Sequence, residues 1–363
     1  MASRSILKRS DERSLLIIVL DVSPVVWQIR QRQREGSDKA RLEKNKPTIG
    51  PATLEECLKS IQAFCGAFCG LQRDCALQIM GVAGNETAVL FPRKDAMHEF
   101  FQGGSAGTSK LDIRPLQDQL IAGVAELVAR PKASEETAAM AAGVSMALCN
   151  VNRFLVANGG GVSAVPSDSS ALFRKDDDGV VSLMGGASKK RKTGKAGAWS
   201  SRILIVQASN DRSQDYNAFM NCAFAAMKHN VVLDGCFIPS NNAQKDPMNS
   251  SFLEQACDRA DGVYLAPSKR AQVGAALTEI LFSIFLAPRS SRSSLNLPAI
   301  HKVDFRARCF DTGATVSMAH VCNQCLSIFQ HLPKDYCPTC GAEIIVKKGA
   351  VGGKEFQNGG AAN

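Results

Sequence analysis

The stretch SLLIIVLDVSP, at Ser14–Pro24, decides the fold that this sequence predicts. Its first part, Ser14–Leu20, is an almost continuous apolar run rich in Ile and Val, as expected for a central strand of a parallel sheet that is covered on both faces. Asp21 and Ser23 follow at the carboxyl end of that strand. Doubly wound sheets place their ligand sites at this end, so the loop is a candidate site. The simpler interpretation is that Asp21 and Ser23 cap the loop after the strand.

Further apolar segments alternate between strand and helix patterns. The predicted strands after the first are Ala76–Val82, Thr87–Phe91, Ile203–Ala208, Val231–Ile238 and Gly262–Ala266. The predicted helices are Ala52–Leu71, Leu116–Ala129, Glu135–Ala157, Gln214–His229, Phe252–Arg259 and Ala271–Ala287. A turn-like triplet at 83–85 joins the second and third strands into a hairpin. This order predicts an α/β domain with a doubly wound, mostly parallel sheet and helices on both faces.

Two polar segments interrupt the alternation. Residues 28–51 are polar and charged, with Gly and Pro, and predict a loop insertion. Residues 158–201 cannot bury enough apolar surface to offset the entropy of ordering, so we expect a mobile loop. A basic tetrad in this loop resembles a nuclear import signal and consists of Lys189, Lys190, Arg191 and Lys192. Solvated surface charge is the alternative. The α/β domain is expected over residues 14–288, after a flexible tail at 1–13.

Composition and charge restrict the class of protein. The 363 residues, 45% of them hydrophobic and 21% charged, suit a globular protein with a sizeable core. We expect neither a secretory signal nor a membrane span, because Leu15–Leu20 is too short and Ala271–Ala287 is interrupted by polar residues. The net charge of +9 lies largely in segments expected to be flexible. It predicts a general attraction to polyanions but no specific recognition of nucleic acid, and we expect DNA to be contacted only indirectly.

Two Cys-x-x-Cys motifs, separated by eleven residues, lie towards the end of the sequence. Two residues between thiolates allow a tight turn to present both sulfurs to one ion. Two such motifs complete a tetrahedral four-sulfur site with no position left for water, and Gly341 allows the chain to turn away behind the second one. The motifs therefore predict a structural zinc ribbon over residues 300–348, followed by a flexible tail at 349–363. The predicted Zn²⁺ ligands are Cys322, Cys325, Cys337 and Cys340.

Other interpretations of these cysteines are weaker. A redox dithiol of the thioredoxin type sits singly at a helix start inside a βαβ unit, and neither motif has that context. His320, His331 and Cys309 lie near enough in the sequence to be considered as ligands, but with four thiols in register we expect them not to bind the metal. A ribbon this small has almost no core, so the metal would supply most of its folding free energy.

The loop after the first strand resembles the metal-dependent adhesion site of von Willebrand factor A domains. In that site an Asp-x-Ser-x-Ser loop, a distant Thr and a second Asp hold Mg²⁺ through oxygen ligands. Here Val25 replaces the second serine, and Gln-Ala-Ser at 207–209 stands where the fourth strand should end in Thr-Asp-Gly. The nearest substitutes are displaced, namely Thr108 and Asp211. We therefore expect Asp21 and Ser23 to be remnants of the site that bind no metal.

A degenerate von Willebrand A domain followed by a four-cysteine ribbon resembles the general transcription factor IIH (TFIIH) subunit 3 family, the small von Willebrand-A subunit of that complex. The resemblance extends from Ser14 to Cys340. Its most specific pieces are Asp21–Pro24 followed by Trp27, Val303–Phe310 and Val321–Phe329. It implies a nuclear, non-catalytic, architectural subunit of the core that opens promoter DNA for RNA polymerase II and acts in nucleotide excision repair. It also implies that the A domain holds the zinc module of the larger von Willebrand-A/RING-like subunit, and that there is no small-molecule substrate.

Enzymatic and DNA-binding alternatives lack the residues they need. A phosphoaspartyl nucleophile after the first strand would require a second acid two residues on, where Ser23 stands. A Mg²⁺-dependent adhesion-type domain lacks the ligands named above. A DNA-contacting finger would need a positive surface, but Lys302–Lys348 holds six Lys or Arg against four Asp or Glu. Phosphate-loop and nucleophile-elbow motifs are also missing, so we expect no enzyme activity.

Overall fold

The computed structural model describes residues 13–44, 50–71, 74–102, 114–134, 137–158, 173–175, 181–183, 199–239, 249–272, 275–298, 306–312 and 315–344. The chain forms two compact units, residues 1–304 and 305–363.

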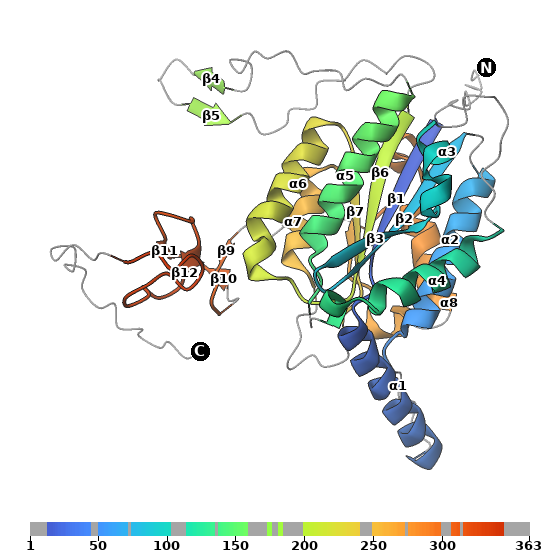
Figure 1. Ribbon diagram of the computed structural model, residues 1–363, viewed down its shortest axis with the longest axis horizontal. Coiled ribbons are helices and arrows are strands. Elements are labelled where there is room, and N and C mark those ends of the chain that lie inside the picture. Colours follow the sequence, from blue (N-terminus) through green and yellow to red (C-terminus); the bar gives the residue numbers. More distant parts are fainter. Residues whose placement is uncertain are drawn as a thin grey trace, which may run out of the picture. The chain divides into compact units, whose positions relative to one another are not determined.

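The first unit is built on a six-stranded sheet (Figure 1). Its strands, in spatial order, are β3 (Glu86–Phe91), β2 (Cys75–Ala83), β1 (Arg13–Asp21), β6 (Trp199–Gln207), β7 (Val232–Phe237) and β8 (Tyr264–Leu265). All neighbours are parallel except β2 and β3, which form an antiparallel hairpin at one edge. The predicted doubly wound, mostly parallel sheet with helices on both faces is confirmed.

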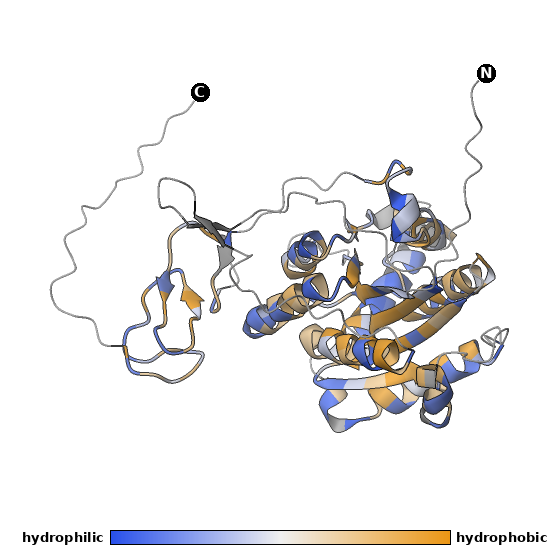
Figure 2. Cartoon of the chain, turned by 90° about the horizontal axis from the view of Figure 1, so that it is seen from above, coloured by the Kyte–Doolittle hydropathy of each residue, from blue (hydrophilic) through white to orange (hydrophobic). Residues whose placement is uncertain are grey.

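The two faces of the sheet carry separate apolar clusters. Side chains alternate along β1, so Leu16 and Ile18 belong to the first cluster and Leu15 and Ile17 to the second. The first cluster is covered by α2 (Leu54–Leu71), α4 (Leu116–Val128), α8 (Ala275–Ile280) and the π-helical turn η6 (Leu281–Phe285). The second is covered by α3 (Met97–Gln102), α5 (Met140–Ala157), α6 (Tyr216–Lys228) and α7 (Ser251–Arg259). Figure 2 shows the apolar strands between these helices.

Helix α5 is long and apolar enough, by length and composition alone, to cross a membrane. In this unit it packs against β1, β2 and β6. Its buried residues, Met140, Ala141, Gly143, Val144, Ala147, Val151 and Phe154, join the second cluster or line its edge. Its apolar character is thus explained by its position against the sheet.

The prediction of a loop over residues 28–51 is wrong for residues 28–44, which belong to α1 (Pro24–Lys44). Gln, Arg, Glu and Lys dominate this segment, and all four are good helix formers. Pro24 occupies the first helical position, where its missing N–H costs nothing. The buried side chains of Trp27 and Arg30 fix the start of the helix, which extends away from the sheet (Figure 1). The polarity of the segment reflects a helix mostly surrounded by solvent.

Other predicted elements differ in detail. The helix predicted at Ala271–Ala287 is divided into η5 (Lys269–Gln272), α8 and η6, and α9 (Arg289–Arg292) follows Pro288. Gln272 donates to the carbonyl of Pro267, which holds the tighter η5 turn (2.9 Å). Within residues 158–201, β4 (Phe173–Lys175) and β5 (Val181–Leu183) form an antiparallel pair. The rest of 159–198, including the predicted import signal, lies outside the described residues.

The second unit consists of short antiparallel pairs around the cysteines. β9 (Ala307–Arg308) pairs with β10 (Thr315–Val316), and β11 (His320–Val321) pairs with β12 (Ile328–Phe329). Among the described residues its apolar cluster is formed by Cys322, Phe329 and Cys337, with Phe310 and Ile344 partly buried beside them. So small a core cannot by itself stabilise a fold, as the sequence suggested.

Candidate metal centre and the carboxyl edge of the sheet

The structure brings the four predicted cysteine ligands together. The sulfurs of Cys322, Cys325, Cys337 and Cys340 all lie within 4.8 Å of one another. Two contacts join one motif to the other: Cys322 to Cys340 at 3.8 Å and Cys325 to Cys337 at 3.7 Å. Four sulfurs at these separations could surround one metal ion.

The two motifs have the same backbone geometry. In the first, the N–H of Leu326 donates to the carbonyl of Cys322 (2.9 Å), and in the second the N–H of Gly341 donates to that of Cys337 (2.8 Å). The residue after each second cysteine has a positive φ, 60° at Leu326 and 71° at Gly341. A left-handed residue at this point turns the chain back so that both sulfurs face the same side. Sequence reasoning identified this role for Gly341 and missed it for Leu326.

The donor set fits a cation of borderline softness. All four donors are sulfur, and four thiols this close cannot all ionise unless a cation offsets their mutual repulsion. The hydroxyl of Ser327, 3.1 Å from the sulfur of Cys325, lowers the pKa of that thiol to about 6. The site therefore already favours a thiolate at one of its positions.

The three other candidate ligands lie outside this cluster. His320 and His331 are exposed, and neither belongs to a metal-sized group of His, Cys, Asp or Glu within the described part of the chain. Cys309 is buried, and its sulfur accepts the N–H groups of Thr312 (3.5 Å) and Gln330 (3.3 Å). Its position between these backbone groups explains its burial without a metal.

The second candidate site is the carboxyl edge of the sheet, formed by the loops after β1, β6 and β7. Asp21 and Ser23 are both fully buried there. One carboxylate oxygen of Asp21 accepts the N–H of Ser23 (3.0 Å), and the other accepts those of Ala208 (3.1 Å) and Ser209 (2.6 Å). The carboxylate thus joins the loops after β1 and β6. Trp27 donates its indole N–H to the carbonyl of Asp21 (2.8 Å), which ties the start of α1 to the same loop.

Arg30 completes this edge, and sequence reasoning missed it. Its side chain is 1% exposed, and its guanidinium donates to the carbonyls of Ala208 (2.8 Å), Ile238 (2.6 Å) and Pro239 (3.4 Å). It lies over the ring of Trp27, 5.2 Å from the centroid. A fixed positive charge therefore sits against the carbonyl groups after β6 and β7. The polar pattern of residues 28–51 predicts a loop, so it does not indicate that Arg30 shares a helix face with Trp27.

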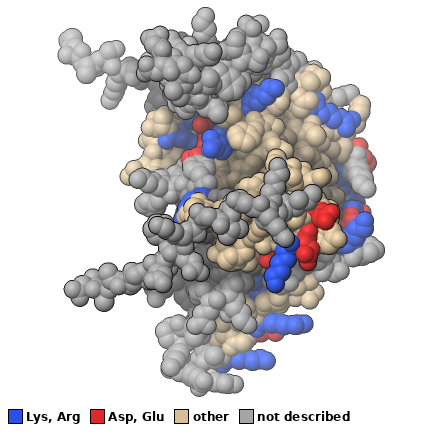
Figure 3. All heavy atoms as spheres, turned by 90° about the vertical axis from the view of Figure 1, so that its left-hand side faces the viewer, with Lys and Arg blue, Asp and Glu red and all other residues tan. Residues whose placement is uncertain are grey.

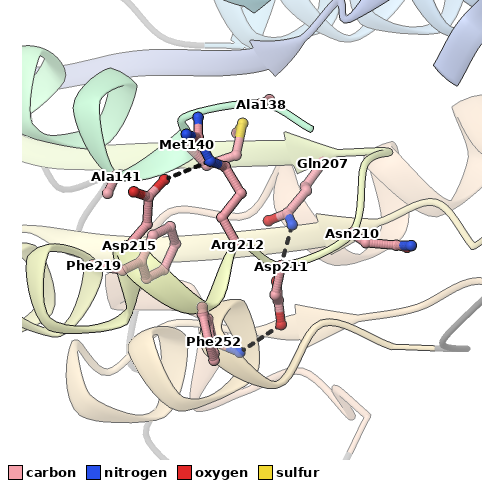
Figure 4. Close-up of a pocket in the computed structure, with 10 residues that line it drawn as sticks. All are labelled: Ala138, Met140, Ala141, Gln207, Asn210, Asp211, Arg212, Asp215, Phe219 and Phe252. Atoms are coloured by element: carbon pink, nitrogen blue, oxygen red, sulfur yellow. Dashed lines mark hydrogen bonds and ion pairs between the residues drawn. The ribbon is translucent and has the colours of Figure 1, made fainter. Parts of the chain in front are cut away.

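Asp211, a displaced substitute in the adhesion-site pattern, has a different role. Its carboxylate accepts hydrogen bonds from the amide of Gln207 (3.0 Å), the hydroxyl of Ser250 and the N–H of Phe252 (3.2 Å). It therefore caps α7 rather than joining Asp21 (Figure 4). Thr108, the other substitute, lies outside the described residues. The hydroxyl of Ser209 accepts the N–H of Ala138 (3.3 Å), so the loop before α5 also reaches this edge.

A small cavity lies beside Asp211, between the end of β6 and the starts of α5, α6 and α7 (Figure 4). Its volume is about 10 Å³, enough for one water molecule. Arg212 crosses it to pair with Asp215 (3.5 Å). Burial raises the pKa of Asp215, and Arg212 opposes that shift. A cavity of this size does not hold a small-molecule substrate.

Comparison with known proteins identifies a family over most of the chain. The model of the family described as "Transcription factor Tfb4" matches residues 13–341. The general transcription and DNA repair factor IIH subunit TFB4 of Debaryomyces hansenii is 27% identical, over 93% of this chain and 87% of its own. General transcription factor IIH subunit 3 of Dictyostelium discoideum is 37% identical, over 40% of this chain and 36% of its own.

Solved structures are similar at low sequence identity. The TFIIH p34 N-terminal domain is 16% identical, with a TM-score of 0.48, over 75% of this chain and 97% of that one. The von Willebrand A domain of SpRpn10 is 12% identical, with a TM-score of 0.39, over 76% of this chain and 97% of that one.

Proposed function

Because the chain belongs to the Tfb4 family of transcription factors, we propose that it is a non-catalytic, architectural subunit of TFIIH. It acts in the nucleus, in transcription initiation by RNA polymerase II and in nucleotide excision repair. The names of its relatives support this role, since those from Debaryomyces hansenii and Arabidopsis thaliana are subunits of general transcription and DNA repair factor IIH.

The observation that carries the architectural assignment is the carboxyl edge of the sheet. An enzyme or a metal-dependent adhesion domain built on this edge needs an acid whose oxygens are available to a metal or substrate. Here both oxygens of Asp21 accept backbone N–H groups, and the neighbouring carbonyls are bound by Arg30. The carboxyl edge of the sheet therefore holds loops together, and we assign partner binding to the outer surface of the domain.

A docking surface is available on the helices that cover the second cluster. Phe224 and Met227, three residues apart on α6, are each 48% exposed, and Met146 on α5 is 37% exposed. The two helices pack against each other. Aromatic and Met side chains are enriched in protein interfaces and among the residues that dominate binding energy. We assign this surface, the α5–α6 face, to the zinc module of the larger von Willebrand-A/RING-like subunit.

The charge distribution also favours protein contact over DNA contact. On the face shown in Figure 3, Lys and Arg stand in small separate groups, several of them beside Asp or Glu. A protein that binds DNA directly gathers positive charge along a stripe or patch. The scattered charges among the described residues support our proposal that DNA is reached through the complex.

We assign the ribbon the role of a small module whose fold depends on a bound metal ion. We assign Zn²⁺ to the four thiolates, since an all-sulfur tetrahedral set is typical of structural zinc. Nuclear entry is assigned to the basic tetrad Lys189–Lys192, which lies outside the described residues.

The test is co-expression of the full chain with the zinc-bearing module of the larger subunit, followed by size-exclusion chromatography. We expect the two to elute together, and residues 14–288 alone to retain the module. Separate elution of the full chain and the module would contradict the architectural assignment. Loss of binding only on removal of the ribbon would shift the docking site away from the α/β domain.

A further inference from the structure

The segment that follows η6, residues 286–297, is attached to the first unit in an unusual way. Leu286 and Leu297, at its two ends, are partly buried against the first apolar cluster. Between them lies α9, and no residue of this short helix is buried. Apolar contacts therefore hold the ends of this segment, which we call the strap, but they do not hold its middle.

A buried ion pair holds the middle of the strap. Asp234 lies on β7, on the same face as Cys236 of the first cluster, and its side chain is 1% exposed. The guanidinium of Arg292 donates to both oxygens of this carboxylate, at 2.7 Å and 2.5 Å, and the Arg292 side chain is 9% exposed. Two such parallel bonds form the strongest arrangement of this pair of groups. The Nε of Arg292 also donates to the carbonyl of Ala287 (3.2 Å), which closes the turn of α9.

A second arginine binds the strap from the sheet itself. Arg202 lies on β6, on the same face as Leu204 of the first cluster, and its side chain is fully buried. Its guanidinium donates to the carbonyls of Phe285 (2.8 Å) and Ala287 (2.9 Å), where η6 passes into the strap. The same guanidinium lies 3.9 Å from the carboxylate of Asp234. The sheet thus presents an acidic and a basic side chain next to each other, and both bind this part of the chain.

Another arginine of α9 makes a comparable pair in solvent. Arg289 donates to the carboxylate of Asp261 (2.7 Å) and to the side-chain oxygen of Asn230 (2.8 Å). The side chains of Arg289 and Asp261 are 36% and 72% exposed, so water screens their attraction. Asp234 has no such access to water, so the loss of Arg292 would leave a buried carboxylate without its main partner. The two arginines of α9 should therefore differ in importance.

We propose that Asp234, Arg202 and Arg292 form a clamp that closes the strap over the first cluster and sets the point at which the chain leaves the first unit. While the clamp is closed, the chain leaves after Leu297, so the folded unit extends beyond residue 288, the end expected from the sequence. Opening the clamp frees the strap and lengthens the connection to the ribbon. The strap lies on the opposite side of the sheet from the α5–α6 face, so the clamp does not depend on the proposed docking site.

Hydrogen–deuterium exchange of the full-length protein, followed by mass spectrometry, tests the clamp. Arg292→Gln removes the pair with Asp234, and we expect the amides of the strap to exchange at least about tenfold faster, because a broken buried ion pair favours local opening. Arg289→Gln is the matched control on the same helix, and exchange should stay within about threefold of the wild type. Peptides covering the buried strand β1 are the internal reference and should be unchanged in both variants.

A second substitution separates opening of the strap from a general folding defect, which would also speed exchange in β1. Arg292→Lys keeps a positive charge beside Asp234 but cannot form two parallel hydrogen bonds. We expect strap exchange to rise by more than about threefold in this variant while β1 is unchanged. If the strap stays within about threefold of the wild type in both Arg292 variants, the flanking leucines hold it and the proposal is overturned. Equal acceleration in the strap and in β1 of Arg292→Lys would also overturn it, since the ion pair would then support the whole fold rather than the strap.

Discussion

Asp21 and Arg30 hold the same residue, Ala208, through opposite ends of its backbone. The carboxylate of Asp21 accepts the N–H of Ala208 at 3.1 Å, and the guanidinium of Arg30 donates to its carbonyl at 2.8 Å. The loops after β1 and β6 and the start of α1 therefore meet at one peptide segment. The carboxylate of Asp21 and the guanidinium of Arg30 hold these loops together. In the adhesion site that this edge resembles, a bound metal ion connects the loops instead.

Asp21 and Ser23 should differ sharply in their contributions to stability. Asp21→Ala leaves three buried N–H groups without an acceptor, at about 1–3 kcal/mol each, so we expect a loss of at least about 3 kcal/mol. The buried hydroxyl of Ser23 has no hydrogen-bond partner among the described residues, so Ser23→Ala should change stability by no more than about 0.5 kcal/mol. Urea unfolding measures both. Equal losses would indicate that Ser23 has a partner, as a metal ligand would.

Magnesium should not bind at the carboxyl edge. Mg²⁺ requires near-octahedral oxygen coordination, and the oxygens of Asp21 are already occupied by backbone N–H groups while Val25 supplies no ligand. Calorimetric titration up to millimolar Mg²⁺ should therefore show no saturable heat. A saturable signal that disappears in Asp21→Ala would overturn this expectation and restore ligand binding at the edge.

The sequence predicted the sheet well because its strands bury both faces and so carry near-continuous apolar runs. Ser14–Leu20 is such a run, and β1 is buried over eight of its nine residues. The loop prediction for the segment that forms α1 is wrong for the opposite reason. A helix surrounded by solvent has little apolar periodicity, so the pattern of residues 28–44 predicts a loop and does not indicate a role for Arg30. Hydrogen bonds between residues far apart in the sequence, such as the bond from Arg30 to the carbonyl of Ile238, cannot be predicted from a local sequence pattern.

The ribbon should contain one zinc ion per chain. Cys325→Ser and Cys337→Ser should each lose it, because three thiolates leave an open position and the folding of so small a core depends on the metal. Cys149→Ser, which removes an exposed thiol from α5, is the matched control and should retain one equivalent. Elemental analysis of the purified proteins gives the ratio. A metal-free ribbon that remains folded, as judged by protection from proteolysis, would refute the assignment.

Leu326 and Gly341 occupy equivalent positions in the two cysteine motifs, and both have a positive φ. Substitutions there test how the backbone conformation affects the zinc affinity of the site. A left-handed residue other than Gly costs roughly 1–2 kcal/mol, so Leu326→Gly should tighten zinc binding and Gly341→Ala should weaken it, each by about fivefold to thirtyfold. A Cβ added at Gly341 would meet no atom within 4 Å, so its effect would come from the backbone alone. Competition with a chromophoric chelator measures the affinity. Changes of the same sign in both variants would mean that the two motifs are not equivalent.

The α5–α6 face should carry the contact with the larger subunit's zinc module. Phe224 projects from α6 with 48% of its surface exposed, and Ile121 projects from α4, on the other side of the sheet, with 55% exposed. Replacing either with Asp removes an exposed apolar side chain from a helix, so both variants should fold with similar small losses of stability.

Only the substitution on the docking surface should affect binding. We expect Phe224→Asp to weaken affinity for the module by about 30-fold or more, corresponding to the roughly 2 kcal/mol that defines a dominant interface residue. Ile121→Asp should remain within about threefold of the wild type. Isothermal titration with the purified module provides both values, and thermal unfolding confirms that the two variants are equally folded. If Ile121→Asp weakens binding while Phe224→Asp does not, the partner docks on the face covered by α2 and α4, and the role of α6 must be reassigned.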